Sequence, residues 1–274
     1  MTLIGLALPN YNEPTENDYA KIAKILPQVI QTMFGHTRHR RPVYDRIRDI
    51  YMAAGYPAPI ITIRIGDGVQ DIEGAEKDFL EAEQQIPGYF KERVYRFGNE
   101  GNIEGWDPVK YCLVFRYLAR KYIDRDFMVM NLCLGSEQDI YEARKKHGYK
   151  STLHLDWVEY LRLLKPCFEY AWAVGLSCYR DDDHNKLRPY KEMMLRLWAV
   201  EFNCDNYRDE ERNVWWQWRM NQLAHGLNVQ VFIPFAIGEP GCSHGAWPER
   251  YLLNDYEVDA WAKICLEKRS VLPF

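Results

Sequence analysis

Two glutamates stand directly after short, largely apolar segments, a position from which carboxylates can do chemistry. Residues 94–98 lead to Asn99 and Glu100, and residues 197–200 lead in the same way to Glu201. In parallel α/β folds, side chains at the carboxyl ends of the strands gather at one edge of the sheet and form the active site. Two carboxylates there can divide acid and base roles, because their repulsion favours one protonated and one ionised group.

The elements that must position these glutamates alternate between strand and helix along the chain. Alternation of this kind implies parallel strands joined by right-handed crossovers. Eight such units in 274 residues match the size of a (β/α)₈ barrel, also called a TIM barrel. An open, doubly wound sheet is the rival. The predicted strands cover 3–8, 29–34, 60–65, 93–98, 127–134, 172–176, 197–202 and 229–236, and the predicted helices 17–26, 42–54, 74–85, 107–122, 155–170, 187–195, 208–225 and 255–268.

Composition limits the class of protein. No linker or low-complexity tract divides the chain, so residues 1–274 are predicted to form a single catalytic barrel domain. Apolar residues make up 47%, as in a globular protein, and the net charge of −4 gives no support to nucleic-acid binding. The seven cysteines include no CxxC pair, so we expect reduced, buried thiols and no zinc ribbon.

The sequence also predicts where the protein works. No apolar run is long enough to span a bilayer, so we expect no membrane partner. The first predicted strand begins almost at Met1, with no signal-peptide pattern before it. We therefore expect a cytoplasmic protein; secretion by another route, or an N-terminus trimmed from a longer chain, is left open.

In a barrel, residues after every strand converge on one mouth, which adds further candidates. Asn10 follows the first predicted strand, His36 the second and Tyr179 the sixth. We expect strands four and seven on opposite sides of the ring, so that Glu100 and Glu201 face each other across the mouth. Tyr11, Arg38, Asp67, Ser136, Glu137, Arg180, Asn203 and Glu239 complete the set.

Two facing carboxylates suit the cleavage of a glycosidic bond, in which one protonates the leaving oxygen and the other attacks or stabilises the sugar carbon. The motifs also resemble a known group of enzymes. Gly-Asn-Glu-Gly-Asn at 98–102 resembles the Asn-Glu signature after strand four in clan A of the glycoside hydrolases. The nearest form is the Gly-Asn-Glu-Pro-Asn of family 39 β-xylosidases and α-iduronidases. Val-Glu-Phe at 200–202 resembles the strand-seven nucleophile segment of the same clan.

The resemblance implies a role for each matching residue. Glu100 matches the acid/base and Glu201 the nucleophile. Asn99 matches the neighbour that hydrogen-bonds the sugar 2-hydroxyl, and Tyr179 the tyrosine that donates to the nucleophile. The implied activity is retaining hydrolysis of a carbohydrate by double displacement, which requires neither a metal nor an organic cofactor.

The sequence also departs from the clan pattern. Gly101 replaces the usual proline, and Ser177 stands where histidine is common. Strand eight lacks the usual tryptophan, for which Trp247 or His244 in the following loop is the expected substitute. Arg38 or Arg64 would be the arginine near the mouth. These departures motivate an alternative, a carbohydrate-binding or structural barrel that has lost turnover. An aldolase or isomerase barrel is disfavoured, because no lysine stands at a predicted strand end.

Two conspicuous clusters are assigned no function. Trp215, Trp216 and Trp218 lie on a predicted helix, and we expect at least two of these rings in the core. The acidic segment 181–185 fits no metal-binding loop, so no metal site is predicted.

Overall fold

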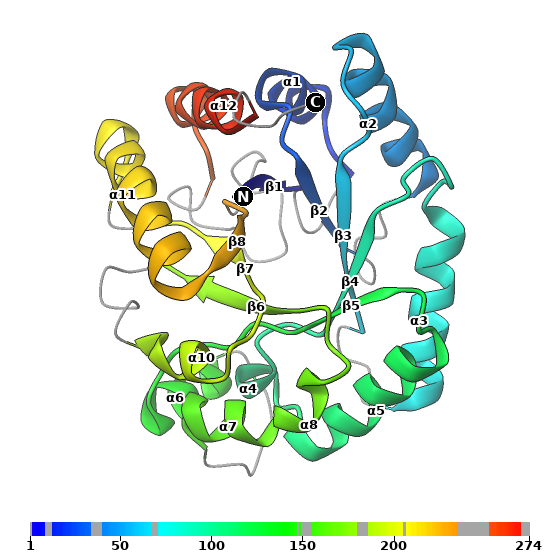
Figure 1. Cartoon of the computed structure of the whole chain (residues 1–274), viewed down its shortest axis with the longest axis vertical. Helices are drawn as coiled ribbons and strands as arrows, with labels where there is room; N and C mark the ends of the chain where they lie inside the picture. The colour runs from blue at the N-terminus through cyan, green and yellow to red at the C-terminus, as the bar shows by residue number, and fades with distance from the viewer. Residues whose placement is uncertain are drawn as a thin grey trace.

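The computed structural model describes residues 2–8, 13–33, 40–66, 71–146, 148, 155–179, 186–204, 207–234 and 252–269. Within these residues, eight parallel strands form a closed barrel in the order β1 to β8, and helices surround it (Figure 1). The predicted (β/α)₈ barrel is therefore confirmed, and the open sheet is wrong. The strands are β1 Leu3–Ala7, β2 Val29–Met33, β3 Ile60–Ile65, β4 Arg93–Phe97, β5 Asp126–Val129, β6 Ala173–Cys178, β7 Leu197–Phe202 and β8 Val229–Phe232.

The outer ring contains more helices than the predicted eight. The additions are a single turn after β4 and further short segments between β5 and β7. None of the helices described here has the length and apolar content needed to cross a membrane. The helices are α1 Glu16–Ile25, α2 Arg41–Ala53, α3 Ile72–Gln85, α4 Gly101–Glu104, α5 Pro108–Lys121, α6 Glu137–Lys146, α7 Trp157–Leu163, α8 Lys165–Phe168, α10 Arg188–Glu192, α11 Asp209–Leu227 and α12 Asp255–Arg269.

Alternate residues of β4 serve the two sides of the barrel wall, as the two-residue period of a strand requires. Tyr95 and Phe97 belong to the large apolar cluster that also contains the buried faces of the helices. Val94 belongs to a second apolar cluster, drawn almost entirely from strands around the ring, which fills the barrel. Arg96, two residues after Val94, is buried on the same side of the strand. The barrel interior therefore changes from apolar to polar towards the carboxyl end of β4.

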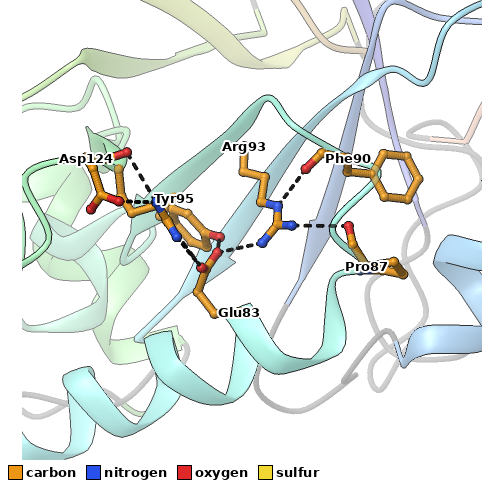
Figure 2. A network of polar contacts seen from close by, with 7 residues as sticks. Glu83, Pro87, Phe90, Arg93, Tyr95 and Asp124 are labelled. Carbon is orange, nitrogen blue, oxygen red and sulfur yellow. Dashed lines mark hydrogen bonds and ion pairs between the residues drawn. The ribbon is translucent and has the colours of Figure 1, made fainter.

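An ionic cluster holds the amino end of β4 (Figure 2). Glu83 of α3 accepts hydrogen bonds from the Tyr95 hydroxyl and from Arg93 Nη1, the latter at 2.9 Å. Its second oxygen pairs with Arg125 Nη2 at 3.1 Å. These contacts lie at the opposite end of the strand from Glu100, so they anchor β4 without occupying the mouth of the barrel.

The last helix closes the barrel against the first strand. Trp261 of α12 donates its indole N–H to the backbone oxygen of Gly5 in β1 at 2.9 Å. α12 also lies beside α1 (Figure 1). Between α11 and α12, Arg212 Nη1 lies 3.1 Å from both carboxylate oxygens of Glu257, and both side chains are fully buried. The two ends of the chain are thus joined in one structure.

The predicted fifth strand, 127–134, is too long. Pairing ends at Val129, because the following backbone is hydrogen-bonded by side chains. The Met130 N–H donates to the Tyr111 hydroxyl at 3.1 Å. The apolar run continues because these residues are still buried, but burial alone does not make a strand.

The predicted helix 155–170 is also corrected: the structure divides it into α7 and α8. Pro166 lies in the first turn of α8, where a missing backbone N–H is tolerated. The expectation that at least two of the three tryptophan rings on the predicted helix 208–225 lie in the core is confirmed. Trp215 and Trp216 are buried on α11, whereas Trp218 is 45% exposed.

Candidate active site

Glu100 is held at the carboxyl end of β4 by an unusual backbone. Gly98 has φ +74° and Glu100 has φ 30°, both in the left-handed region. That conformation costs a non-glycine residue on the order of 1–2 kcal/mol. The carbonyl of Glu100 accepts from the amides of Ile103 and Glu104, which closes the single turn of α4. Strain of this kind concentrates at functional sites, where the surrounding structure maintains it.

The glycine after Glu100 has a packing reason. A Cβ at Gly101 would lie 2.4 Å from Met130 Sδ and 3.2 Å from Trp106 Cβ. Proline would need that same space, so it would require Met130 to move. Glycine at position 101, in place of the usual proline, therefore leaves room for the Met130 side chain that packs against it.

The second asparagine of the motif ties this loop to the segment after β5. Asn102 Nδ2 donates to the Cys133 carbonyl at 2.8 Å, and Asn102 Oδ1 accepts from the Cys133 amide at 3.0 Å. Arg144 of α6 donates from Nε to the Asn102 carbonyl at 2.7 Å. Asn102 is thus a structural link that fixes the loop carrying Glu100.

Glu201 lies in β7 and is only 6% exposed. The Tyr179 hydroxyl, directly after β6, donates to Glu201 Oε2 at 2.7 Å. This is the contact that the resemblance implied. Ser177 of β6 is the residue paired in register with Glu201 on the neighbouring strand. β6 therefore places two hydroxyl groups beside the glutamate of β7.

Ser177 also lies beside Glu100. Its Oγ donates to Glu100 Oε1 at 3.3 Å. In the closed order β1 to β8, two strands separate β4 from β7 on one side and four on the other, so the two strands lie across the barrel but not diametrically opposite each other. Glu100 and Glu201 are close enough for the charge of Glu201 to act on Glu100.

The electrostatics of Glu100 are those of an acid that keeps its proton. Burial is the main cause and, together with the negative charges of Glu201 and Glu104, raises the pKa of Glu100 to about 8. The hydrogen bond from Ser177 and the positive charge of Arg64 oppose this shift. At neutral pH, Glu100 is therefore mainly protonated.

A chain of hydrogen bonds fixes the direction of the Ser177 proton. Arg96 Nη1 donates to Asn131 Oδ1 at 2.9 Å, and Asn131 Nδ2 donates to Ser177 Oγ at 2.8 Å. A guanidinium only donates, so the Asn131 oxygen must face Arg96 and its NH₂ must face Ser177. The Ser177 oxygen then accepts, and its proton points to Glu100. We call Arg96, Asn131 and Ser177 the serine relay.

Sequence reasoning missed two members of the serine relay, although each leaves a signal. Arg96 is a charged residue in the buried part of β4, between the apolar rings of Tyr95 and Phe97. Asn131 is a fully buried amide within the apolar run that was read as strand five. A polar side chain at such a position has to be hydrogen-bonded inside the barrel. Its presence therefore predicts a second buried polar side chain next to it.

Asn99 is 9% exposed and donates from Nδ2 to Glu104 Oε1 at 3.1 Å. Among the described residues, its buried Oδ1 has no hydrogen-bond partner. Glu104 is a carboxylate that sequence reasoning missed. Its signal is the spacing of four residues from Glu100: Glu100 precedes the single turn of α4, and Glu104 ends it.

The remaining predicted positions do not enlarge the observed site. Asn10, His36 and Trp247 lie outside the described residues, so their roles stay predictions. Ser136 is described: its hydroxyl oxygen accepts from the Asp139 backbone amide at the start of α6 as a helix cap, and its proton goes to the Asp139 carboxylate. In the described ranges, no group of three or more histidine, cysteine or acidic side chains is arranged to hold a metal ion.

Comparison with known proteins finds similar folds and no similar sequences. No family model and no curated protein matches the chain. A GH128 (subgroup II) endo-β-1,3-glucanase from Pseudomonas viridiflava matches with TM-score 0.61 and 11% identity, over 99% of this chain and 98% of that one. A GH128 (subgroup VI) exo-β-1,3-glucanase from Aureobasidium namibiae matches with TM-score 0.56 and 10% identity, over 97% and 99%.

A psychrophilic glycoside hydrolase family 10 endo-β-1,4-xylanase matches with TM-score 0.53 and 12% identity, over 94% of this chain and 96% of that one. Identities this low establish a shared fold and nothing finer. The chain therefore has a (β/α)₈ barrel of the kind found in glycoside hydrolases.

Proposed function

We propose that this protein is a glycoside hydrolase of clan A that retains the anomeric configuration, with Glu201 as nucleophile and Glu100 as acid/base. One observation carries the proposal. Glu100 is buried beside Glu201 and has a pKa raised to about 8, while Glu201 accepts a hydrogen bond from Tyr179. Two carboxyl groups whose environments separate their roles are what this chemistry requires.

Each glutamate then has two tasks. Glu201 attacks the anomeric carbon while protonated Glu100 gives its proton to the departing oxygen. Glu100, now ionised, takes a proton from water, which attacks the glycosyl-enzyme and releases Glu201. The hydrogen bond from Ser177 favours the ionised form of Glu100, so it assists the second step. Asn99 Oδ1 is the proposed acceptor for the sugar 2-hydroxyl.

The proposed substrate is a carbohydrate with a glycosidic bond. The named substrates of the fold relatives, β-1,3-glucan and β-1,4-xylan, are reasonable first polymers to test. The 98–102 motif supports a relationship to family 39, so aryl β-xylosides belong in the same panel. We also keep as proposals that residues 1–274 form one catalytic domain and that the protein is cytoplasmic.

Retention is tested through the product. The two carboxyl groups are expected about 5–5.5 Å apart, the separation typical of retaining enzymes. NMR of the first product formed from a β-glycoside should then show the β-anomer before it mutarotates. An α-anomer as first product would replace double displacement by inversion.

The two glutamates are distinguished by truncation. Glu201→Ala removes the covalent step, so it should lose activity on every substrate. Glu100→Ala removes proton donation, so the loss of activity in this variant should depend on the leaving group. Dinitrophenolate needs no proton, and the glycosyl-enzyme should therefore form quickly and then accumulate.

The readouts are mass spectrometry and chemical rescue. Glu100→Ala treated with a dinitrophenyl glycoside should carry one added sugar on Glu201, and added azide should restore turnover as a glycosyl azide. A carbohydrate-binding or structural barrel would bind sugar in all three forms and would never be labelled. A wild type that neither turns over activated glycosides nor traps fluorinated sugars across a broad panel would end the catalytic proposal.

A further inference from the structure

Two cysteines outside the candidate active site lie in direct contact. Cys112 is on α5 and Cys167 is on α8, and the Cys167 thiol donates to Cys112 Sγ with the sulfur atoms 2.8 Å apart. Cys112 is 5% exposed and Cys167 is fully buried. None of the six cysteines in the described part of the chain is in a disulfide.

We propose that Cys112 and Cys167 are a redox-active pair, which hydrogen peroxide converts to a disulfide that joins α5 to α8. The proposal is independent of any glycosidase activity. It depends on the proximity of the two sulfur atoms and on the groups around them. A disulfide requires its two thiols to be close before oxidation, and here the native fold brings them together.

The surroundings assign different roles to the two sulfurs. The hydrogen bond from Cys167 is the main cause that lowers the pKa of Cys112, and the positive charge of Arg116, one turn further along α5, acts in the same direction. Burial raises the pKa of Cys167. Cys112 is therefore the thiolate former and Cys167 the proton donor, and Cys112 is also the more accessible of the two.

The chemistry balances without any further reactant. The Cys112 thiolate attacks one oxygen of hydrogen peroxide, the O–O bond breaks, and Cys112 becomes a sulfenic acid. The hydroxide released takes up the proton that the Cys112 thiol had lost and becomes the first water. The Cys167 sulfur then attacks Cys112 Sγ: the S–S bond forms and the S–O bond breaks. The departing hydroxide takes the Cys167 proton and leaves as water. Two thiols lose two electrons in total, and the peroxide is reduced to two waters.

Cys133 provides an internal competitor for this reaction. It is not part of a disulfide, and it is more exposed than either member of the pair. If exposure alone decided reactivity, peroxide would modify Cys133 first. If proximity decides, the disulfide between Cys112 and Cys167 forms while Cys133 stays a thiol or is oxidised without a partner.

The test uses the wild-type chain, reduced and freed of reductant, then treated with hydrogen peroxide and alkylated under denaturing conditions. Peptide mapping by mass spectrometry should find the peptides of Cys112 and Cys167 linked, and dithiothreitol should separate them. The oxidised protein should also melt higher by roughly 5–10 °C, because the link closes a long loop of the unfolded chain.

Variants provide the matched controls. Cys112→Ser and Cys167→Ser should each abolish the linked peptide and the rise in melting temperature, whereas Cys133→Ser should leave both in place. Far-UV circular dichroism of the reduced proteins checks that each variant folds. Wild type in which Cys112 and Cys167 both remain alkylatable after peroxide, or link to other cysteines instead, would overturn the proposal.

Discussion

The proton on Glu100 determines how the proposed activity should depend on pH. Burial, with the charges of Glu201 and Glu104, raises its pKa to about 8. Proton donation requires the protonated form, so kcat/KM should be sustained at neutral pH and fall by about tenfold per unit above roughly pH 8. The measurement is a pH profile on a glycoside with a poor leaving group. A dinitrophenyl glycoside, which needs no acid, should lose much less, and an alkaline limb below pH 6 would contradict the assignment.

The serine relay gives a second prediction at the scale of single residues. Ser177 donates to Glu100 Oε1 and favours its ionised form. Ser177→Ala should therefore raise the pKa of Glu100 further and move the alkaline limb upward by on the order of one pH unit. Deglycosylation should slow, because the base is less readily ionised.

Ser136→Ala is the matched control for this prediction, since the Ser136 hydroxyl oxygen caps α6 by accepting from the Asp139 amide. It should leave the alkaline limb where it is. A purely structural role for Ser177 would lower activity without moving the limb, and that result would reject the relay as a means of tuning Glu100.

Residue types alone predicted part of this site. Glu100 and Glu201 are recognisable because a carboxylate after an apolar strand is unusual, and the contact of Tyr179 with Glu201 was predicted by the resemblance. Ser177 was noticed only as a departure. The direction in which Ser177 donates depends on Asn131 and Arg96. These two residues lie on other segments of the chain and come into contact with it only in the closed barrel. Spacing in the sequence carries no information about such contacts.

At the scale of elements, the ion pair between α11 and α12 should be one of the most sensitive positions. Glu257 accepts from Arg212 and from the backbone amides of Asp209 and Asn254. Glu257→Ala leaves the Arg212 charge buried without its carboxylate. The free energy of unfolding should fall by about 3–5 kcal/mol, measured by urea denaturation.

The exposed pair within α10 is the control for this prediction. Arg188 Nε lies 3.3 Å from Glu192 Oε1 on the surface. Glu192→Ala should leave the denaturation midpoint almost unchanged, because exposed ion pairs contribute little. Equal effects of the two substitutions would mean that burial does not determine the energy of these pairs.

Helices and strands were predictable where their apolar period was regular, and less so where side chains replace backbone partners. β3 and β7 have the predicted bounds. α4 was missed because a single turn has no measurable period, and it exists because Glu100 adopts a left-handed backbone. β5 ends early because Tyr111 takes the next amide. These local hydrogen bonds are invisible to periodicity.

At the scale of the whole molecule, eight strand–helix units were enough to predict a barrel. They did not predict that its interior has an apolar end and a polar end. One end is filled by apolar side chains from strands around the ring. At the other end, Arg96, Asn131 and Ser177 meet below Glu100. The apolar layer keeps water from the barrel, and the polar layer positions the acid. Polar residues tolerated at the centre of a barrel are therefore a useful sign of where its chemistry lies.

The closure of the barrel leads to a last prediction, about cooperativity. Trp261 is fully buried on α12, contacts the rings of Phe202 and Trp216, and donates to Gly5 in the first strand. Trp261→Ala removes this hydrogen bond and the ring contacts that join α12 to the barrel. Its cost should be about 3–5 kcal/mol, as for other buried aromatic truncations.

The form of the unfolding curve is as informative as its midpoint. If β1 to β8 unfold together, far-UV circular dichroism and tryptophan fluorescence should give coincident urea transitions in wild type and at a lower midpoint in Trp261→Ala. Trp218→Ala is the matched control: that ring is 45% exposed on α11, so its loss should shift the midpoint far less. Coincident transitions are expected because a closed barrel has no edge at which one half can unfold while the other stays paired. Separate transitions in wild type would instead show that the chain contains more than one cooperative unit.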